Sequence, residues 1–275
     1  MKGLQIKQVT RVIGAEISGV SLNEPLSSED RAAIEAALLE HHVLFFRDQD
    51  ITPEEQVEFA RQFGEISTPP FTPKYSKSPD YIVLDQTNPE GEGADNWHSD
   101  NTFMAEPPLG SILKAVLLPK AGGDTCFANM AAAYQALSEP IRAMLDGLEA
   151  EHDITKPLQK AIDAGHSEAN LSEVQAKWPP VRHPVVRKHP VTGNKALFVN
   201  GNSTTRLLEI SERENQMLLP FLLDHVRSPT FQCRFRWDAH SIAFWDNRST
   251  QHYAVPDYQE RRVMHRVTLA GDRPT

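Results

Sequence analysis

A histidine and an aspartate lie two residues apart in the segment Asn96-Trp97-His98-Ser99-Asp100. Because side chains alternate between the two faces of a β-strand, a strand here would project both side chains from one side. An imidazole nitrogen and a carboxylate oxygen that meet at one point form part of a metal site. A second histidine would complete the facial triad that binds iron(II) in non-haem oxygenases. The pair alone is a weak signal, because such pairs also occur in polar loops.

His252 is the best candidate for the second histidine. The preceding segment 245–251 runs from an apolar strand through a polar turn to the start of the next strand. Two strands that are far apart in sequence can be neighbours in a rolled sheet, so His252 could reach His98. His152, in Glu151-His152-Asp153, is a competitor that could bind the metal or form hydrogen bonds in the core.

Four other histidines have structural explanations. His183 and His189 each precede a proline in a predicted strand and turn context. His41 and His42 end a predicted helix, where a positive or polar group suits the helix dipole.

Two arginines lie four residues apart in Arg262-Val263-Met264-His265-Arg266. If this segment is a strand, Arg262 and Arg266 share one face and stand about 13 Å apart, at roughly 3.3 Å per residue. Two surface arginines on an outward face would be the ordinary interpretation. The apolar residues 267–270 and the nearness of the preceding turn to His252 are compatible with inward-facing arginines instead. Buried guanidinium groups need anions, so the pocket could hold two anionic molecules beside one metal.

Composition narrows the class of protein. The 275 residues are 40% hydrophobic and 24% charged, which is typical of a globular domain. The net charge of −9 and the lack of a Lys/Arg run argue against nucleic-acid binding, and no apolar run is long enough to span a membrane. The two cysteines, Cys126 and Cys233, match no zinc pattern and fit a reducing cytoplasm. We therefore expect a cytoplasmic protein.

Strands dominate the expected secondary structure, with helices packed outside them. The sequence predicts strands at 8–13, 15–20, 43–46, 81–84, 111–118, 125–127, 181–187, 197–199, 231–237, 242–245 and 262–269. This pattern favours a single domain over residues 1–275, mostly β with flanking helices (α+β), with a double-stranded β-helix or jelly-roll core.

Helices are expected to begin near Ser28, Thr52 and Ser211, and a broken helical stretch covers 130–148. A capping box supports two of these starts, with Glu55 following Thr52 and Glu214 following Ser211. Residues from about 154 to 180 are polar and weakly periodic, and they are too many for a simple connection. They form either a lid or a variable insert, and we favour a lid.

Several short motifs resemble the taurine dioxygenase family of iron(II)- and 2-oxoglutarate-dependent oxygenases. They occur in the family's order along nearly the whole chain: Ile13-Gly14-Ala15-Glu16, Val43-Leu44-Phe45-Phe46-Arg47, Gly122-Gly123-Asp124-Thr125, His183-Pro184-Val185-Val186-Arg187 and Trp245-Asp246-Asn247-Arg248. The resemblance implies an enzyme that consumes 2-oxoglutarate and O2, releases succinate and CO2, and hydroxylates a substrate. It also implies a homo-oligomer, because relatives in this family are dimers or tetramers.

The resemblance also implies roles for six residues. His98, Asp100 and His252 would ligate iron(II), and 2-oxoglutarate and O2 would take the remaining positions. Thr125 and Arg262 occupy the positions that bind the distal carboxylate of 2-oxoglutarate. Arg266 occupies the position that binds the anionic end of the primary substrate.

The chain departs from the family's pattern at the pocket wall. Pro69 replaces a histidine that contacts the sulfonate, Ala94 replaces an asparagine, and Ile154 and Ser203 replace aromatic residues. Together with Asn101, these residues are expected to decide the substrate. An anionic small molecule (a sulfonate, sulfate ester, phosphonate or carboxylate) is expected, and the departures argue against taurine itself.

Two other classes of protein remain as alternatives. A metal-dependent hydrolase could use the same three ligands, although zinc prefers more nitrogen or sulfur ligands and the two arginines would have no evident role. A non-catalytic jelly-roll binding protein is the other alternative, and the presence of the ligand set argues against it.

Overall fold

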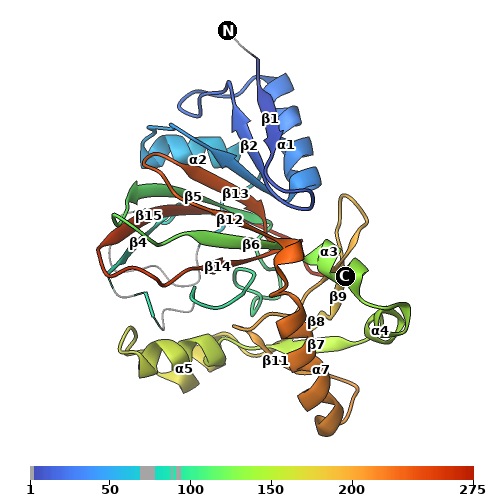
Figure 1. Cartoon of the computed structure of the whole chain (residues 1–275). Helices are drawn as coiled ribbons and strands as arrows, with labels where there is room; N and C mark the ends of the chain where they lie inside the picture. The colour runs from blue at the N-terminus through green and yellow to red at the C-terminus, as the bar shows by residue number, and fades with distance from the viewer. Residues whose placement is uncertain (1–2, 69–77, 88, 91–93) are drawn as a thin grey trace.

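A seven-stranded sheet crosses the middle of the molecule (Figure 1). The structure is a computed structural model that describes residues 3–68, 78–87, 89–90 and 94–275. In spatial order the strands are β1 (Gln5–Gln8), β2 (Ala15–Ser18), β3 (Val43–Phe46), β13 (Ile242–Asp246), β5 (Gly110–Leu117), β15 (Arg262–Leu269) and β4 (Ile82–Gln86). All neighbouring pairs are antiparallel except β2 and β3.

A second, three-stranded sheet packs against the large one. It consists of β12 (Gln232–Phe235), β6 (Thr125–Asn129) and β14 (Thr250–Ala254), with β6 in the middle. A buried cluster fills the space between the sheets, and within it the ring of Phe127 lies 5.7 Å from the rings of both Phe45 and Trp245. The two facing sheets, which are antiparallel apart from the β2–β3 pair, form a jelly-roll core with helices outside, so the predicted fold class is confirmed.

Helices α1 (Ser28–His41) and α2 (Pro53–Arg61) cover the outer face of the large sheet (Figure 1). Ile34 of α1 and Phe59 of α2 are buried there with Phe244 of β13. The capping box predicted for α2 is present, because the Thr52 hydroxyl accepts from the Glu55 amide and the Glu55 carboxylate accepts from the Thr52 amide.

Smaller elements extend the molecule on the side of β14. They comprise β7 (Glu149–His152), β8 (Val181–Pro184), β9 (Val186–Lys188), β10 (Lys195–Leu197), β11 (Thr204–Leu207), α3 (Met130–Ala136), α4 (Glu139–Leu145), α7 (Glu212–His225) and the 3-10 turn η1 (Pro229–Phe231). A separate buried cluster, which includes Leu145, Val199 and Leu222, joins them. The capping box predicted at Ser211 and Glu214 begins α7.

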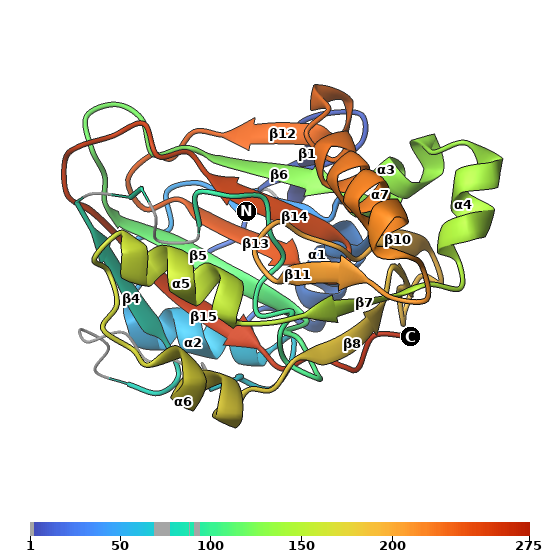
Figure 2. The same cartoon turned by 90° about the horizontal axis from the view of Figure 1, so that it is seen from below.

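The segment expected to be a lid or insert contains two helices, α5 (Thr155–Asp163) and α6 (Leu171–Lys177). Seen from below, both lie in front of the sheets (Figure 2). Neither helix has a fully buried side chain. Hydrogen bonds tether this segment, among them Lys160 Nζ to Asp95 Oδ1 at 2.6 Å.

The strand predicted at 8–13 is wrong, because β1 ends at Gln8 and a turn follows. The Thr10 hydroxyl accepts hydrogen bonds from the amides of Val12 and Ile13, and Gly14 adopts a φ of 89°. A side chain that bonds to its own backbone competes with strand pairing, so the β-rich composition of this segment was misleading.

Within the described part of the chain, no helix combines the length and apolar character that crossing a membrane requires.

Candidate active site

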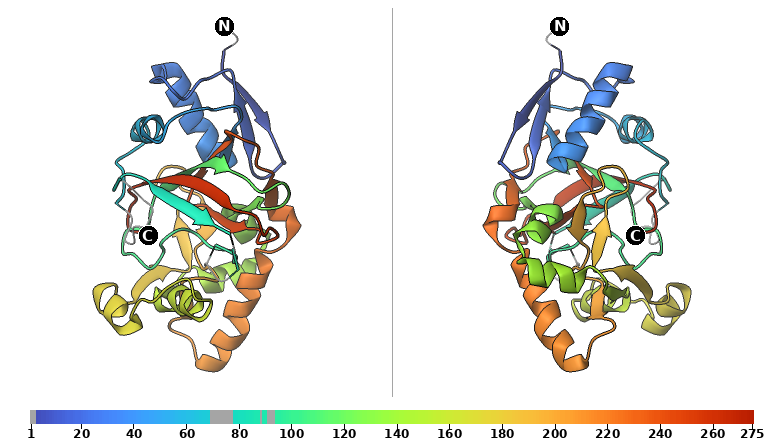
Figure 3. Two further views of the ribbon diagram at one scale, coloured as in Figure 1. Left: turned by 90° about the vertical axis from the view of Figure 1, so that its left-hand side faces the viewer. Right: turned by 90° about the vertical axis from the view of Figure 1, so that its right-hand side faces the viewer.

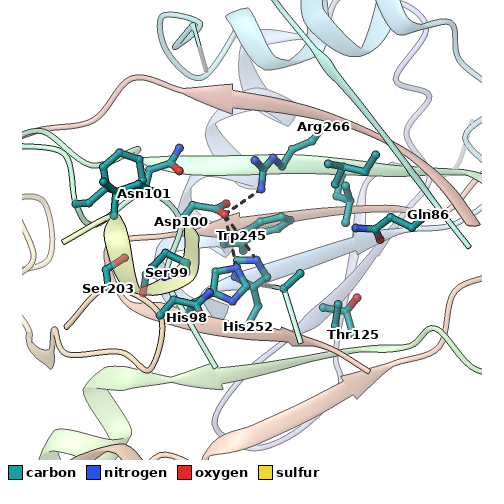
Figure 4. A pocket seen from close by; sticks show the side chains of 18 of the residues that line it. Gln86, His98, Ser99, Asp100, Asn101, Thr125, Ser203, Trp245, His252 and Arg266 are labelled. Carbon is teal, nitrogen blue, oxygen red and sulfur yellow. Dashed lines mark hydrogen bonds and ion pairs between the residues drawn. The ribbon is translucent and has the colours of Figure 1, made fainter. Parts of the chain in front are cut away.

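His98, Asp100 and His252 converge on one point between the two sheets (Figure 4). One ligand atom from each side chain lies within 4.8 Å of the others. The Asp100 Oδ1 atom is 3.9 Å from Nε2 of both His98 and His252. All three side chains are buried. Two imidazole nitrogens and one carboxylate oxygen in this arrangement form the donor set of a facial triad.

A single β-bridge, rather than the expected strand, positions the two histidines. The His98 amide donates to the His252 carbonyl at 3.0 Å, and the His252 amide donates to the His98 carbonyl at 2.8 Å. The chain then turns, and Asn101 has a positive φ of 50°. The alternation of side chains along a strand is therefore not what brings Asp100 to the site.

Asn247 and Ser111 hold Asp100 in place instead. The Asn247 side chain accepts from the Asp100 amide at 2.7 Å and donates to the Asp100 carbonyl at 3.0 Å. The Ser111 hydroxyl donates to Asp100 Oδ2 at 2.9 Å. Because Oδ2 is engaged in this way, Oδ1 remains as the carboxylate oxygen that faces the histidines.

The protonation states suit a cation. His98 Nδ1 lies 2.8 Å from the Asn96 carbonyl, which can only accept, so Nδ1 carries the proton and Nε2 keeps its lone pair. Burial lowers the pKa of His98, and burial and the nearby His98 lower the pKa of His252 to about 3. Burial acts to raise the pKa of Asp100, but Arg266, the two histidines and the Ser111 hydrogen bond together outweigh it and keep that pKa well below its usual range. The site therefore presents two neutral imidazoles and one carboxylate at neutral pH.

Arg262 and Arg266 of β15 share one face, as the strand periodicity predicts, and both line the cavity, so the inward alternative holds rather than the outward one. Arg266 Nη1 contacts Asp100 Oδ1 at 3.0 Å. Arg262 is only 3% exposed, and its Nε and Nη2 atoms have no hydrogen-bond partner among the residues that the structure describes. Its guanidinium lies 6.0 Å from the ring centre of Trp237 and 5.9 Å from that of Tyr258. Burial lowers the pKa of Arg262, and the opposing effects of Tyr258 and Asp124 offset this only in part.

A cavity of about 280 Å³ connects these groups. Every predicted site residue within the described ranges lines it: Ala94, His98, Asp100, Asn101, Thr125, Ile154, Ser203, His252, Arg262 and Arg266. Pro69 lies outside the described residues. The cavity is also lined by five residues that no motif in the sequence indicates: Leu84, Gln86, Phe103, Pro157 and Asn202.

His152 is not part of the metal group. Its Nδ1 atom lies 2.9 Å from the Thr102 hydroxyl, and its side chain is fully buried. His183 contacts the Thr102 carbonyl at 2.9 Å, and His189 contacts Asp246 Oδ2 at 2.9 Å. These three histidines support the core, which settles the alternative for His152 in favour of hydrogen bonding.

Comparison with known proteins identifies the family. The family model described as "Taurine catabolism dioxygenase TauD, TfdA family" matches residues 5–268. The chain belongs to this family. Among curated proteins, it is 40% identical to an alpha-ketoglutarate-dependent sulfate ester dioxygenase of Pseudomonas putida, over 98% of this chain and 91% of that protein. It is 38% identical to an alkylsulfatase of Acinetobacter baylyi, over 99% of this chain and 86% of that protein.

Solved structures of TauD/TfdA-like proteins agree with the fold. A taurine dioxygenase from Burkholderia xenovorans, described as putative in its name, superposes with a TM-score of 0.86 at 37% identity, covering 99% of this chain and 94% of that one. The structure of AAD-2 in complex with Mn(II) and N-oxalylglycine superposes with a TM-score of 0.85 at 32% identity, covering all of both chains. The TauD/TfdA-family chain is thus an alpha-ketoglutarate-dependent dioxygenase, as predicted, and this enzyme class displaces the hydrolase and the non-catalytic binding protein.

The residues that support this dioxygenase site carry weak sequence signals. Asn247 lies in the motif Trp245-Asp246-Asn247-Arg248, but nothing in its spacing indicates hydrogen bonds to a residue 147 positions away. Trp237 ends a predicted strand and donates from Nε1 to the Thr125 hydroxyl at 3.0 Å. Such contacts between distant segments depend on the folded sheets and cannot be read from local patterns.

His42 gives a prediction about acid stability. It caps the C-terminal end of α1 with a φ of 67°, contacts the Ser249 hydroxyl at 2.8 Å, and has its pKa lowered to about 4 by burial. The unfolded chain binds this proton near pH 6.5, whereas the folded chain does not until about pH 4. The contribution of neutral His42 to the free energy of unfolding is therefore fully present above pH 6.5 and is lost as the pH falls towards 4. The loss amounts to up to about 3 kcal/mol, at 1.4 kcal/mol per pKa unit.

We expect His42→Asn to reduce the slope of unfolding free energy against pH in this window, because asparagine tolerates positive φ without an ionisable ring. Urea denaturation at a series of pH values would measure the slope. His240→Asn is the matched control, since His240 has a φ of 60° but an exposed side chain. An unchanged slope in His42→Asn would contradict the assignment.

Proposed function

We propose that this dioxygenase binds iron(II) and 2-oxoglutarate and hydroxylates a small anionic organic substrate, with a sulfate ester as the first candidate. The observation that carries the proposal is the combination of two cavity-facing arginines with a buried two-histidine, one-carboxylate group. Buried guanidinium groups need anionic partners, and two imidazoles with one carboxylate form the donor set for a metal cation.

His98, Asp100 and His252 would hold the iron. The fit rests on the free lone pair of His98 Nε2, on the orientation of Asp100 Oδ1 and on the low pKa of His252. Three protein ligands leave positions for 2-oxoglutarate and O2. When bound, iron(II) supplies the activation of O2 that is coupled to conversion of 2-oxoglutarate into succinate and CO2.

Arg262 and Thr125 would bind the distal carboxylate of 2-oxoglutarate. The unpaired Nε and Nη2 atoms of Arg262 provide the donors that a carboxylate accepts in fork geometry. The Thr125 hydroxyl already accepts from Trp237, which leaves its own proton for a further acceptor. The similar structure with Mn(II) contains N-oxalylglycine, which is also a dicarboxylate.

Arg266 would bind the anionic group of the primary substrate, next to the ligand group. Phe103, Ile154 and Pro157 give the cavity an apolar wall that suits an alkyl or aryl chain, whereas Asn101 and Ser203 add polar contacts. The sulfate ester is the first candidate because the P. putida and A. baylyi relatives are named for sulfate ester and alkylsulfate chemistry. Hydroxylation of the carbon that bears the ester oxygen gives a product that collapses to an aldehyde and sulfate.

We extend the proposal to the domain organisation, the α5–α6 segment, the cellular compartment and the oligomeric state. The chain acts as one domain, and the α5–α6 segment closes the cavity as a lid, since Ile154 and Pro157 both line that cavity. The two free cysteines fit a cytoplasmic enzyme. We also propose that the protein is a homo-oligomer, either a dimer or a tetramer.

Anaerobic binding and turnover together test this function. Adding iron(II) and 2-oxoglutarate without O2 is expected to give a weak visible charge-transfer band. With O2 and a medium-chain alkyl sulfate, succinate, aldehyde and sulfate should form in equal amounts. His98→Ala should lose the band and the product. Absence of the band in the unchanged protein would refute the metal site, whereas a band with no product from any alkyl sulfate would refute only the substrate.

Substitution of the two arginines is expected to affect KM for different substrates. Arg262→Ala is expected to raise KM for 2-oxoglutarate about 10- to 100-fold, since a charged hydrogen bond is worth about 1.5–3 kcal/mol. At saturating iron(II), Arg266→Ala should raise KM for the primary substrate by a similar factor; the iron must be saturating because Arg266 also pairs with Asp100. Arg236→Ala, at an exposed position, is the control. Equal effects of both variants on both substrates would contradict the division of roles.

Proteolysis tests the lid. If α5 closes over bound ligands, tryptic cleavage after the exposed Lys160 should slow by several fold when Mn(II), N-oxalylglycine and substrate are added together. Cleavage at the exposed Lys120 provides the control. Equal cleavage of α5 with and without ligands would identify the segment as a static insert.

A further inference from the structure

Helix α7 presents an apolar stripe to solvent, far from the metal group. Met217 is 65% exposed and Phe221 is 47% exposed, and the two residues are one helical turn apart. Met144 of α4 is 44% exposed beside them. Together with Ile141 and Leu218 these side chains line a groove of about 340 Å³ between α4 and α7. Large apolar side chains gathered in this way mark an interaction surface more often than chance exposure.

The position of the groove separates it from catalysis. Both views in Figure 3 show α7, in orange, at the end of the molecule opposite the N-terminus. The inner face of the helix is already packed, because Leu219 and Leu222 are buried in the cluster below it. The outer stripe therefore contributes nothing to the core of a single chain, and none of its residues lines the metal cavity.

Two unpaired charges flank the stripe. Arg213 lies near the start of α7 and Asp224 near its end, and both are exposed. Eleven residues span about three turns at 3.6 residues per turn, so the two side chains lie on the same side of the helix, about 16 Å apart. In the part of the chain that the structure describes, neither residue has an ion-pair partner. The helix dipole also disfavours both charges, because Arg213 lies near the positive N-terminal end and Asp224 near the negative C-terminal end.

We propose that a second copy of this chain covers the groove, with the two α7 helices packed antiparallel about a twofold axis. With the axis between residues 218 and 219, Arg213 lies at the same height as the partner's Asp224, and symmetry repeats the pair. In this antiparallel pair, Arg213 lies beside the C-terminal end of the other copy's α7, and Asp224 lies beside its N-terminal end. Each charge is thus next to the helix end whose dipole attracts it. Met217 and Phe221 lie close to the axis and enter the groove of the other copy. The surface is thus self-complementary in charge and in apolar area, as a twofold interface requires.

The charge pair gives a sharp test of this arrangement. Arg213→Asp and Asp224→Arg each place like charges opposite one another, so each is expected to raise the dissociation constant of the α7 contact about 10- to 100-fold. The double variant Arg213→Asp/Asp224→Arg restores opposite charges in the same register and should recover association. Because both positions are exposed, the variants should fold, which circular dichroism checks. Phe221→Glu should remove the contact completely.

Sedimentation equilibrium measures the mass over a range of protein concentrations. The unchanged chain should form dimers or larger even-numbered assemblies of the 30.8 kDa protomer, and Phe221→Glu should halve that mass. Val191→Glu, at a valine that is 63% exposed outside this surface, is the control and should leave the mass unchanged. A monomeric unchanged chain, an assembly that Phe221→Glu leaves intact, or a double variant that fails to recover would each overturn the proposal. The turnover assay remains independent of these outcomes, because the surface lies outside the cavity.

Discussion

The contact between Arg266 and Asp100 is the interaction on which the site depends. A buried carboxylate is costly unless it is paired, and Arg266 pairs with the same oxygen that both histidines face. With neutral histidines, Asp100, Arg262 and Arg266 give the cavity a net charge of plus one. Iron(II) and doubly ionised 2-oxoglutarate would cancel each other and leave that charge unchanged. A substrate with a single negative charge then makes the filled cavity neutral, which favours a sulfate ester, sulfonate or carboxylate over a doubly charged anion.

The fold supplies this arrangement by bringing distant segments to one opening between two sheets. His252 comes from the small sheet, Arg262 and Arg266 come from the large one, and His98 and Asp100 come from a loop held by a single bridge. The two hydrogen bonds between the Asn247 side chain and the Asp100 backbone link that loop to the turn between β13 and β14. His42 contacts the same turn from the end of α1. The ligand group is therefore braced by the helical layer behind the large sheet as well as by its own neighbours.

The sequence predicted much of this site, although one reason was wrong. His98, Asp100 and His252 do converge, but through a bridge and a turn rather than through strand alternation. The strand periodicity of 262–269 correctly placed both arginines on one face, because alternation is a local property that the regular pairing with β4 preserves. The apolar residues 267–270 and the nearness of His252 were the reasons to consider an inward face. The strand at 8–13 failed where the Thr10 hydroxyl bonded to the local backbone. Trp237 and Asn247 were missed because their contacts join segments more than a hundred residues apart.

The overall charge of the chain and the charge of its cavity have opposite signs, and distance decides which one a substrate meets. The net charge of −9 repels anions at long range, but salt screens exposed charges beyond roughly 8 Å at physiological ionic strength. The cavity arginines are buried or nearly so, and screening weakens buried charges much less. An anion therefore gains its attraction only after it enters the cavity and loses water. The choice between different anions therefore depends on the cavity wall. Ile154 and Pro157, at the start of the α5 segment, form part of that wall.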